Sequence, residues 1–93
     1  MIQSFRCKET AKISEGRYSK KLPHDIQQRA LNKLRLIATA TQLETLRIPP
    51  SNHLEALSGD RKHQHSIRIN QQWRVCFRWE AGNAHDIDIV DYH

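Results

Sequence analysis

The apolar positions of the chain change their spacing near residue 50, from a helical period in the first half to a period of two in the second. In the first half, this spacing predicts an amphipathic helix over residues 23–39, with apolar positions at Ile26, Ala30, Leu34, Ile37 and Ala38. Pro23 suits the first turn of this helix, and Asp25 complements the positive end of its dipole. The pattern therefore predicts one helix with a continuous apolar face.

The segments on either side of this helix carry weaker signals. Residues 3–7 are compatible with a short first strand, and residues 8–18 with a weakly held helix. A capping-box pattern at residues 41–44 predicts that a second short helix begins at Thr41. Two consecutive prolines, Pro49 and Pro50, cannot continue a helix, so the helical region is expected to end there.

Alternating polar and apolar residues predict strands in the second half of the chain. The predicted strands, separated by turn-forming residues, are 53–57, 66–69, 73–79 and 84–90. A strand, then helices, then an antiparallel meander is the order of an α+β protein with helices packed on one face of the sheet. The chain has 93 residues, which suits one domain, so residues 1–93 are expected to form a single unit.

Alternation also predicts which side chains share a face of the sheet. Neighbouring side chains on a strand point to opposite faces, so the residues between the apolar positions point away from the helices. One register then places four residues on a common open face: Arg68, Arg74, Arg78 and Tyr92. Arginine binds phosphate oxygens through two donors and tyrosine stacks on unpaired bases, so such a face suits RNA. The alternative is a solvated face whose arginines pair with Asp86 and Asp88.

The charge distribution favours a polyanionic partner. Lys and Arg number 15 against 10 Asp and Glu, which gives a formal net charge of +5. Residues 61–79 contain five basic residues and no acidic one, whereas residues 80–93 contain four acidic residues. A nucleic acid, an acidic protein or an anionic membrane surface would suit this charge.

Length and pattern exclude several classes of protein. No apolar run approaches the roughly 18–20 residues that cross a bilayer, and the first residues lack the apolar core of a secretory signal. The two cysteines, Cys7 and Cys76, form no metal or redox motif, so reduced thiols and a cytoplasmic location are expected. The histidines match no zinc-site spacing and there is no G-x-S-x-G motif, so neither a metal site nor a serine hydrolase is expected.

The last residues of the chain, Asp91, Tyr92 and His93, carry candidate catalytic side chains. Histidine changes its charge near neutral pH, and an adjacent carboxylate can orient it. Cleaving RNA without a metal needs a base for the 2′-hydroxyl proton, cations around the phosphorane and an acid for the leaving 5′-oxygen. Tyr92 and His93 would supply the proton transfers, and Arg68 and Arg74 the positive charge.

Several motifs, read together, resemble HigB-type toxins of the RelE/ParE superfamily of bacterial toxin–antitoxin systems. They are L-x-G-D-R at residues 57–61, S-I-R-x-N-x-x-W-R at 66–74 and a closing D-Y-H at 91–93, and residues 1–5 also fit. The resemblance implies N-terminal helices on a twisted antiparallel sheet. It also implies a metal-independent endoribonuclease, without a cofactor, that cuts mRNA in the ribosomal A site and leaves a cyclic phosphate.

The resemblance further implies partners and residue roles. The partners are a helix-turn-helix antitoxin of the HigA type and a ribosome with mRNA in its A site; operator DNA is bound only through the antitoxin, and no membrane is involved. Arg74 matches the strand arginine that the superfamily uses at the scissile phosphate. The C-terminal catalytic cluster is matched by Asp91, Tyr92 and His93, and the residues expected to bind RNA are Arg61, Arg68 and Arg78.

Two positions depart from the pattern of some HigB toxins, which carry histidine where this chain has Glu55 and lysine where it has Ser58. His53, at the same strand parity as Glu55, is a candidate substitute for that histidine. The departures leave two alternatives open. A toxin of this fold with another target, such as DNA gyrase, needs no acid–base pair, and a non-catalytic module would only bind an antitoxin or RNA.

Overall fold

A computed structural model describes residues 1–91, and helix α2 (Gln27–Thr39) is its longest helix. A 3-10 turn, His24–Ile26, precedes α2 directly. The apolar face of α2 is buried at Ala30, Leu34 and Ile37. This confirms the helix predicted over residues 23–39, with a tighter first turn, but Ala38, which was predicted on the apolar face, is exposed.

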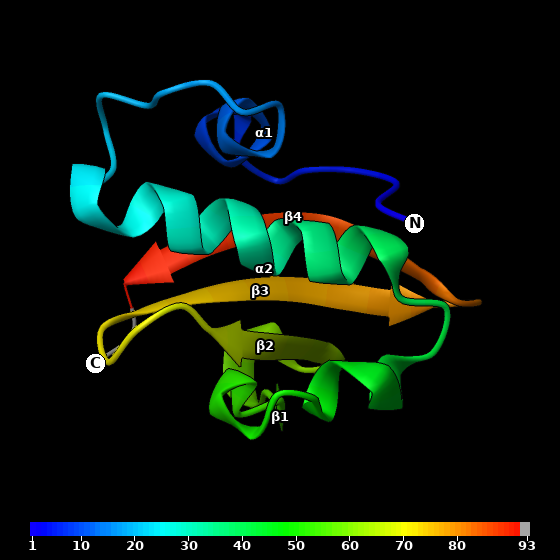
Figure 1. The fold of residues 1–93 in the computed structure, drawn as a ribbon. Coiled ribbons are helices and arrows are strands. Elements are labelled where there is room, and N and C mark those ends of the chain that lie inside the picture. The colour runs from blue at the N-terminus through cyan, green and yellow to red at the C-terminus, as the bar shows by residue number, and fades with distance from the viewer. Residues whose placement is uncertain (92–93) are drawn as a thin grey trace.

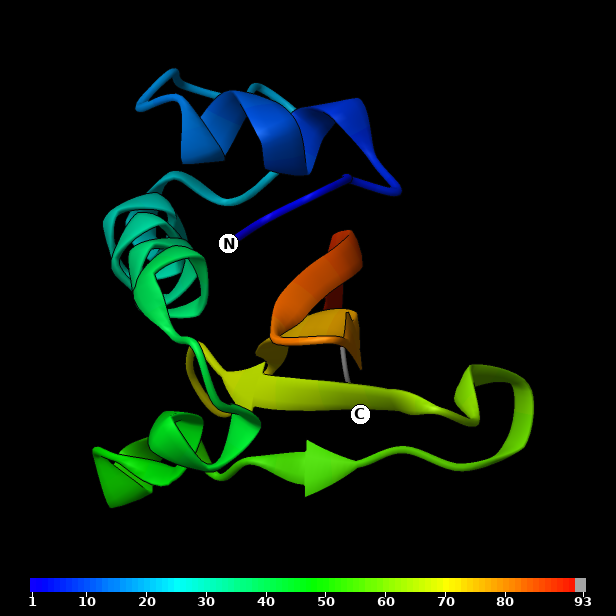
Figure 2. The ribbon, with the colours of Figure 1, turned by 90° about the vertical axis from the view of Figure 1, so that its right-hand side faces the viewer.

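Four strands of residues 1–91 form one antiparallel sheet beneath the helices. They are β1 (Glu55–Ala56), β2 (Gln64–Arg68), β3 (Trp73–Glu80) and β4 (Asn83–Asp91), and they lie side by side in chain order. Helices α1 (Lys8–Ser14) and α2 lie on the same side of this sheet, and β1 is the strand farthest from α1 (Figures 1 and 2). The predicted α+β class is therefore confirmed.

The core lies between α2 and the sheet, where the alternating apolar residues of the strands meet the helical face. The large strand residues with no exposed surface here are Ile67, Val75, Phe77 and Ile87. Burying side chains of this size contributes about 1.5–3 kcal/mol each. The period-two pattern thus predicted correctly which strand residues pack under the helices.

The N-terminal residues do not form the predicted strand at 3–7. They run parallel to the outer edge of β4 instead and touch it at two isolated bridges, Ile2 to Ala84 and Phe5 to Ile87. Between these bridges Asp86 has a φ of 54°, and the pairing of β3 with β4 shifts its register nearby. A β-bulge of this kind interrupts the regular hydrogen-bond ladder that a full strand needs.

The connection between α2 and the sheet also differs from the prediction. No side-chain cap forms at Thr41, and the next element is a 3-10 helix, Leu43–Arg47. A further 3-10 turn, Pro50–Asn52, follows the first proline, so the helical region does not end at Pro49. The buried side-chain amide of Asn52 donates to the carbonyls of Leu46 and Ile48, at 3.1 and 3.2 Å, which holds this connection compact.

The predicted strand 53–57 shortens to the two residues of β1. His53 has a φ of 46°, in the left-handed region, and a strand cannot run through that conformation. The strand parity assumed for His53 and Glu55 is therefore wrong. Among the helices of residues 1–91, none has the length and apolar character to cross a membrane.

Candidate functional site

Three of the predicted arginines lie on one face of the sheet. Arg68 is the direct partner of Arg74 across β2 and β3, and Gln64 is the partner of Arg78. Residues directly opposite in an antiparallel pair share a face, and alternate residues of one strand do so as well. We call this side, carrying Arg68, Arg74 and Arg78, the arginine face; it is opposite the face that packs under the helices.

The arginine face is not open at Arg74, contrary to the prediction. Arg74 is only 4% exposed, and its neighbours Ser66 and Cys76 are fully buried. Its Nε donates to the hydroxyl of Ser66 at 2.8 Å, and Nη2 donates to the backbone carbonyl of His53 at 2.6 Å. A buried charge is tolerated only when it is hydrogen-bonded or paired, so these contacts fix the guanidinium in one orientation.

Glu55 lies beside Arg74, at the position where some HigB toxins carry histidine. The Glu55 carboxylate is 3.9 Å from Nη2 of Arg74, and its side chain is about half exposed. Glu55 is also the direct partner of Ser66, so β1 brings an acidic group to the arginine face. This carboxylate offsets part of the positive charge of Arg74.

The remaining basic residues of the predicted set differ in their pairing. Arg78 pairs with Glu80 and with Asp86, whose carboxylate lies 3.3 Å from Nε. Arg61 reaches Asp88 at 3.4 Å. For Arg78, the structure therefore matches the ion-paired alternative that the sequence left open, and Arg61 is paired with a carboxylate in the same way.

Arg68 differs from these two arginines. It is half-buried, and within residues 1–91 it has no hydrogen bond or ion pair to a neighbouring side chain. Its position opposite Arg74 places an uncompensated guanidinium next to a fixed one. Arg68 can therefore bind an anion without breaking a hydrogen bond or an ion pair to another described residue.

Asp91 lies at the end of β4, one residue after Val90, the direct partner of Arg74, so strand alternation puts Asp91 on the other face of the sheet from Arg74. It is the direct partner of Trp73, and its carboxylate accepts a hydrogen bond of 3.1 Å from the side-chain amide of Gln72. The 70–72 turn is ordered by Asn70, whose side-chain oxygen accepts from the backbone amides of Gln72 and Trp73. The other two predicted catalytic residues, Tyr92 and His93, lie outside the described residues.

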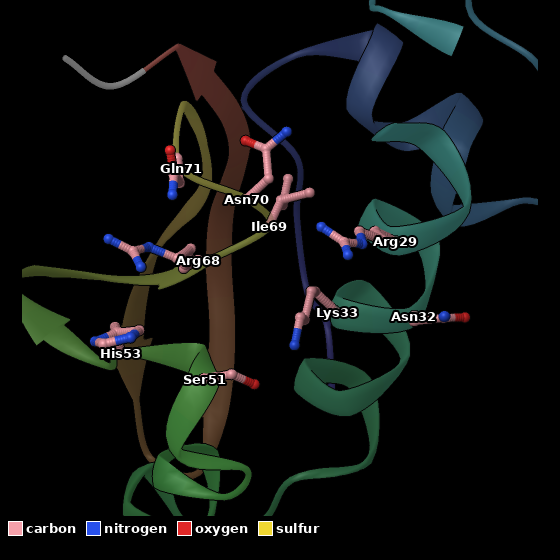
Figure 3. Close-up of a pocket in the computed structure, with 9 residues that line it drawn as sticks. All are labelled: Arg29, Asn32, Lys33, Ser51, His53, Arg68, Ile69, Asn70 and Gln71. Carbon is pink, nitrogen blue, oxygen red and sulfur yellow. The ribbon is translucent and has the colours of Figure 1, made fainter. Parts of the chain in front are cut away.

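A pocket of about 420 Å³ opens between α2 and the end of β2. Arg29 and Lys33 line it from α2, His53 from the connection before β1, and residues 68–71 from the strand side (Figure 3). Lys33 donates to the side-chain oxygen of Asn52. The sequence analysis did not identify Arg29 and Lys33, because they lie off the apolar face of α2 and helical spacing does not show which residues such positions meet.

Burial changes the chemistry of three further groups. It lowers the pKa of Lys33, and the charge of Arg29 lowers it further. It also lowers the pKa of His65, whose Nδ1 is buried without a hydrogen-bond partner among the described residues. Burial raises the pKa of the Cys76 thiol. Within residues 1–91, no three His, Cys, Asp or Glu side chains gather in an arrangement that could hold a metal ion.

N-terminal helices on one side of a four-stranded antiparallel sheet are the architecture of RelE-like toxins. Residues 3–93 match the family described as the RelE-like toxin of type II toxin–antitoxin system HigB, and the chain belongs to this HigB-like toxin family. The sequence-based resemblance is therefore confirmed.

Two relatives illustrate the similarity. A protein named Toxin HigB-1, from Vibrio cholerae serotype O1, is 40% identical over 63 residues, which are 68% of this chain and 66% of that protein. A protein named Endoribonuclease HigB, from Proteus vulgaris, is 31% identical over 93 residues and covers both chains completely. The chain thus spans about two thirds of the first relative and the full length of the second.

Proposed function

We propose that this chain is the toxin of a type II toxin–antitoxin pair and acts as an endoribonuclease on mRNA in the ribosomal A site. Membership of the HigB-like toxin family and the similarity to a protein named Endoribonuclease HigB support the enzyme class. Within this chain, the observation that supports the proposal is the fixed guanidinium of Arg74, which lies next to Arg68 and to the end of β4.

The reaction we propose is attack of a ribose 2′-oxygen on the adjacent phosphorus. A base removes the 2′-hydroxyl proton, the new O–P bond forms, and the bond from phosphorus to the 5′-oxygen breaks as an acid protonates that oxygen. The products are a 2′,3′-cyclic phosphate and a free 5′-hydroxyl. Arg74 and Arg68 stabilise the extra negative charge of the phosphorane. Tyr92 and His93 supply the proton transfers, and Asp91 orients His93, without a metal or cofactor.

The proposed partner is an antitoxin of the HigA type, a helix-turn-helix protein that neutralises the toxin and alone contacts operator DNA. The proposed site of action is the cytoplasm, where ribosomes translate mRNA. A gene for a small helix-turn-helix protein beside the toxin gene, whose co-expression restores growth, would support this partner. Growth arrest that persists when that neighbour is co-expressed would contradict it.

The experiment that tests the activity is induction of the chain without antitoxin, followed by mapping of mRNA 5′ ends. Cuts within codons, dependent on ribosomes and with cyclic phosphate ends, are expected. His93→Ala and Tyr92→Ala should each lower cleavage by roughly 10²–10⁴-fold if they act as acid or base. Losses below about tenfold for Arg74, Asp91, Tyr92 and His93 alike would reject this site.

The same experiment separates the alternatives. If growth stops while transcripts stay intact, a supercoiling assay with purified gyrase tests the second target. If growth continues and the chain binds its antitoxin tightly, a non-catalytic module is favoured. The observation that favours a test for reduced catalysis is the position of the acidic Glu55 beside Arg74.

A further inference from the structure

The pocket between α2 and β2 carries positive charge that the protein does not neutralise. None of its nine lining residues is acidic. Within residues 1–91, Arg29 and Arg68 have no ion-pair partner, and the ammonium of Lys33 contacts only the neutral amide oxygen of Asn52. Like charges held together without a counterion destabilise a surface, so this pocket favours a bound anion.

The positive side chains of the pocket come from its two sides. Figure 3 shows Arg29 and Lys33 extending from α2 toward the strand side, whereas the side chains of Arg68 and His53, on the strand side, point away from α2. The positive groups therefore occupy two successive places instead of converging on one point. A chain of phosphates matches this arrangement better than a single compact anion does.

The residues that line the pocket are linked to Arg74 and to Asp91, two residues of the proposed catalytic site. His53 lines the pocket, and its backbone carbonyl accepts the hydrogen bond from Arg74. Gln71 also lines it, and the adjacent Gln72 donates to Asp91. A phosphate bound by Arg29 and Lys33 would thus be near the scissile linkage without being part of it.

We propose that Arg29 and Lys33 bind a backbone phosphate of the RNA at a nucleotide outside the scissile linkage. This rests on the proposed function and extends it by a second phosphate subsite on the helical side of the sheet. The amide side chains of Asn32 and Asn70 and the hydroxyl of Ser51 line the same pocket. These groups can donate to phosphate and ribose oxygens. A volume of about 420 Å³ lies in the range of pockets that bind small ligands.

The test compares Arg29→Gln with Arg35→Gln in the full chain. Both arginines are exposed on α2, the two changes alter the net charge equally, and Arg35 does not line the pocket. The first probe is a 2′-O-methyl single-stranded octanucleotide, which cannot be cleaved by 2′-oxygen attack. Arg29→Gln should weaken its binding about tenfold at low salt, the loss expected for a charged hydrogen bond. The log–log salt slope should become shallower by about 0.7, the value for one phosphate contact on a single strand.

The second measurement is cleavage of ribosome-bound mRNA by the same variants. Arg29→Gln should raise KM about tenfold and leave kcat within about twofold, because uniform binding energy is lost while the reacting groups stay in place. Arg35→Gln should match the unchanged protein in both assays. If Arg29→Gln behaves like Arg35→Gln in both, the second phosphate subsite is rejected.

Two further outcomes separate this inference from the proposed function. If no cleavage occurs but octanucleotide binding depends on Arg29, the pocket binds RNA and the nuclease function fails. If inorganic phosphate shifts the NMR signals of Arg29 and Lys33 while the octanucleotide neither displaces it nor binds there, the pocket is a site for a free anion and the inference is overturned.

Discussion

Arg68 and Arg74 face each other directly across β2 and β3, yet Arg74 is almost completely buried and Arg68 is not. Two positive charges directly opposite on a sheet repel each other unless something compensates one of them. The contacts of Arg74 with Ser66, the His53 carbonyl and the nearby Glu55 carboxylate supply that compensation. The pair therefore combines one guanidinium fixed by the protein with one that has no partner among residues 1–91.

Replacing Arg74 should reduce stability as well as activity. Arg74→Met leaves the Ser66 hydroxyl and the His53 carbonyl without their donor, which should lower the free energy of unfolding by about 1–3 kcal/mol. Arg68→Met breaks no contact of this kind and should change it by less than about 0.5 kcal/mol. Urea unfolding of both variants measures the difference. Equal losses would show that Arg74 is not held as described.

Arg68 and Arg78 should differ in their effect on RNA binding, although both were predicted to bind RNA. Arg78 is paired with Glu80 and Asp86, so a phosphate must compete with two carboxylates, whereas Arg68 has no such competitor among residues 1–91. Arg68→Gln should weaken binding of a 2′-O-methyl RNA about tenfold, and Arg78→Gln by less than about threefold. Titrations of both variants at one salt concentration test this order, and a larger loss for Arg78→Gln would reverse the assignment.

Gln72 should act as a positioning residue for Asp91. Its side-chain amide donates to the Asp91 carboxylate, and both residues are exposed, so Gln72→Ala should leave the free energy of unfolding unchanged. The expected effect is a fall in kcat of about fivefold, the equivalent of one hydrogen bond near 1 kcal/mol, with KM unchanged. Gln42→Ala, at an exposed glutamine distant in sequence, is the control. A change in KM alone would place Gln72 in substrate binding instead.

Stability should fall in acid partly through Glu9. The Ser19 hydroxyl donates to the Glu9 carboxylate at 2.7 Å, and this bond, with the ammonium of Lys12, holds the pKa of Glu9 below its ordinary value. Because the folded pKa is the lower one, this contribution is present above the unfolded pKa and is lost as pH falls through the folded pKa. Glu9→Gln should flatten stability across that acidic range in urea unfolding, and Glu15→Gln, at an exposed position, should not.

The architecture could be predicted from local patterns in the sequence. Side chains on a helix repeat every 3.6 residues and those on a strand every two, so spacing alone identified α2, β2, β3 and β4 and the strand residues that form the core. Antiparallel pairing preserves this parity across strands, which is why Arg68, Arg74 and Arg78 were correctly expected on one face. The connection through residues 41–57 has no such period, and its 3-10 turns were missed.

By itself, the sequence determined the α+β class, the shared face of the three arginines and the resemblance to HigB-type toxins, because each depends on neighbouring or regularly spaced residues. Tertiary structure alone decided which of those charges remain available. Arg74 donates to a carbonyl 21 residues away in the sequence, and Arg61 is paired with a carboxylate 27 residues away. Arg29 and Lys33 lie across a pocket from residues 68–71. Such contacts follow from how the chain folds back on itself, and no local period in the sequence records them.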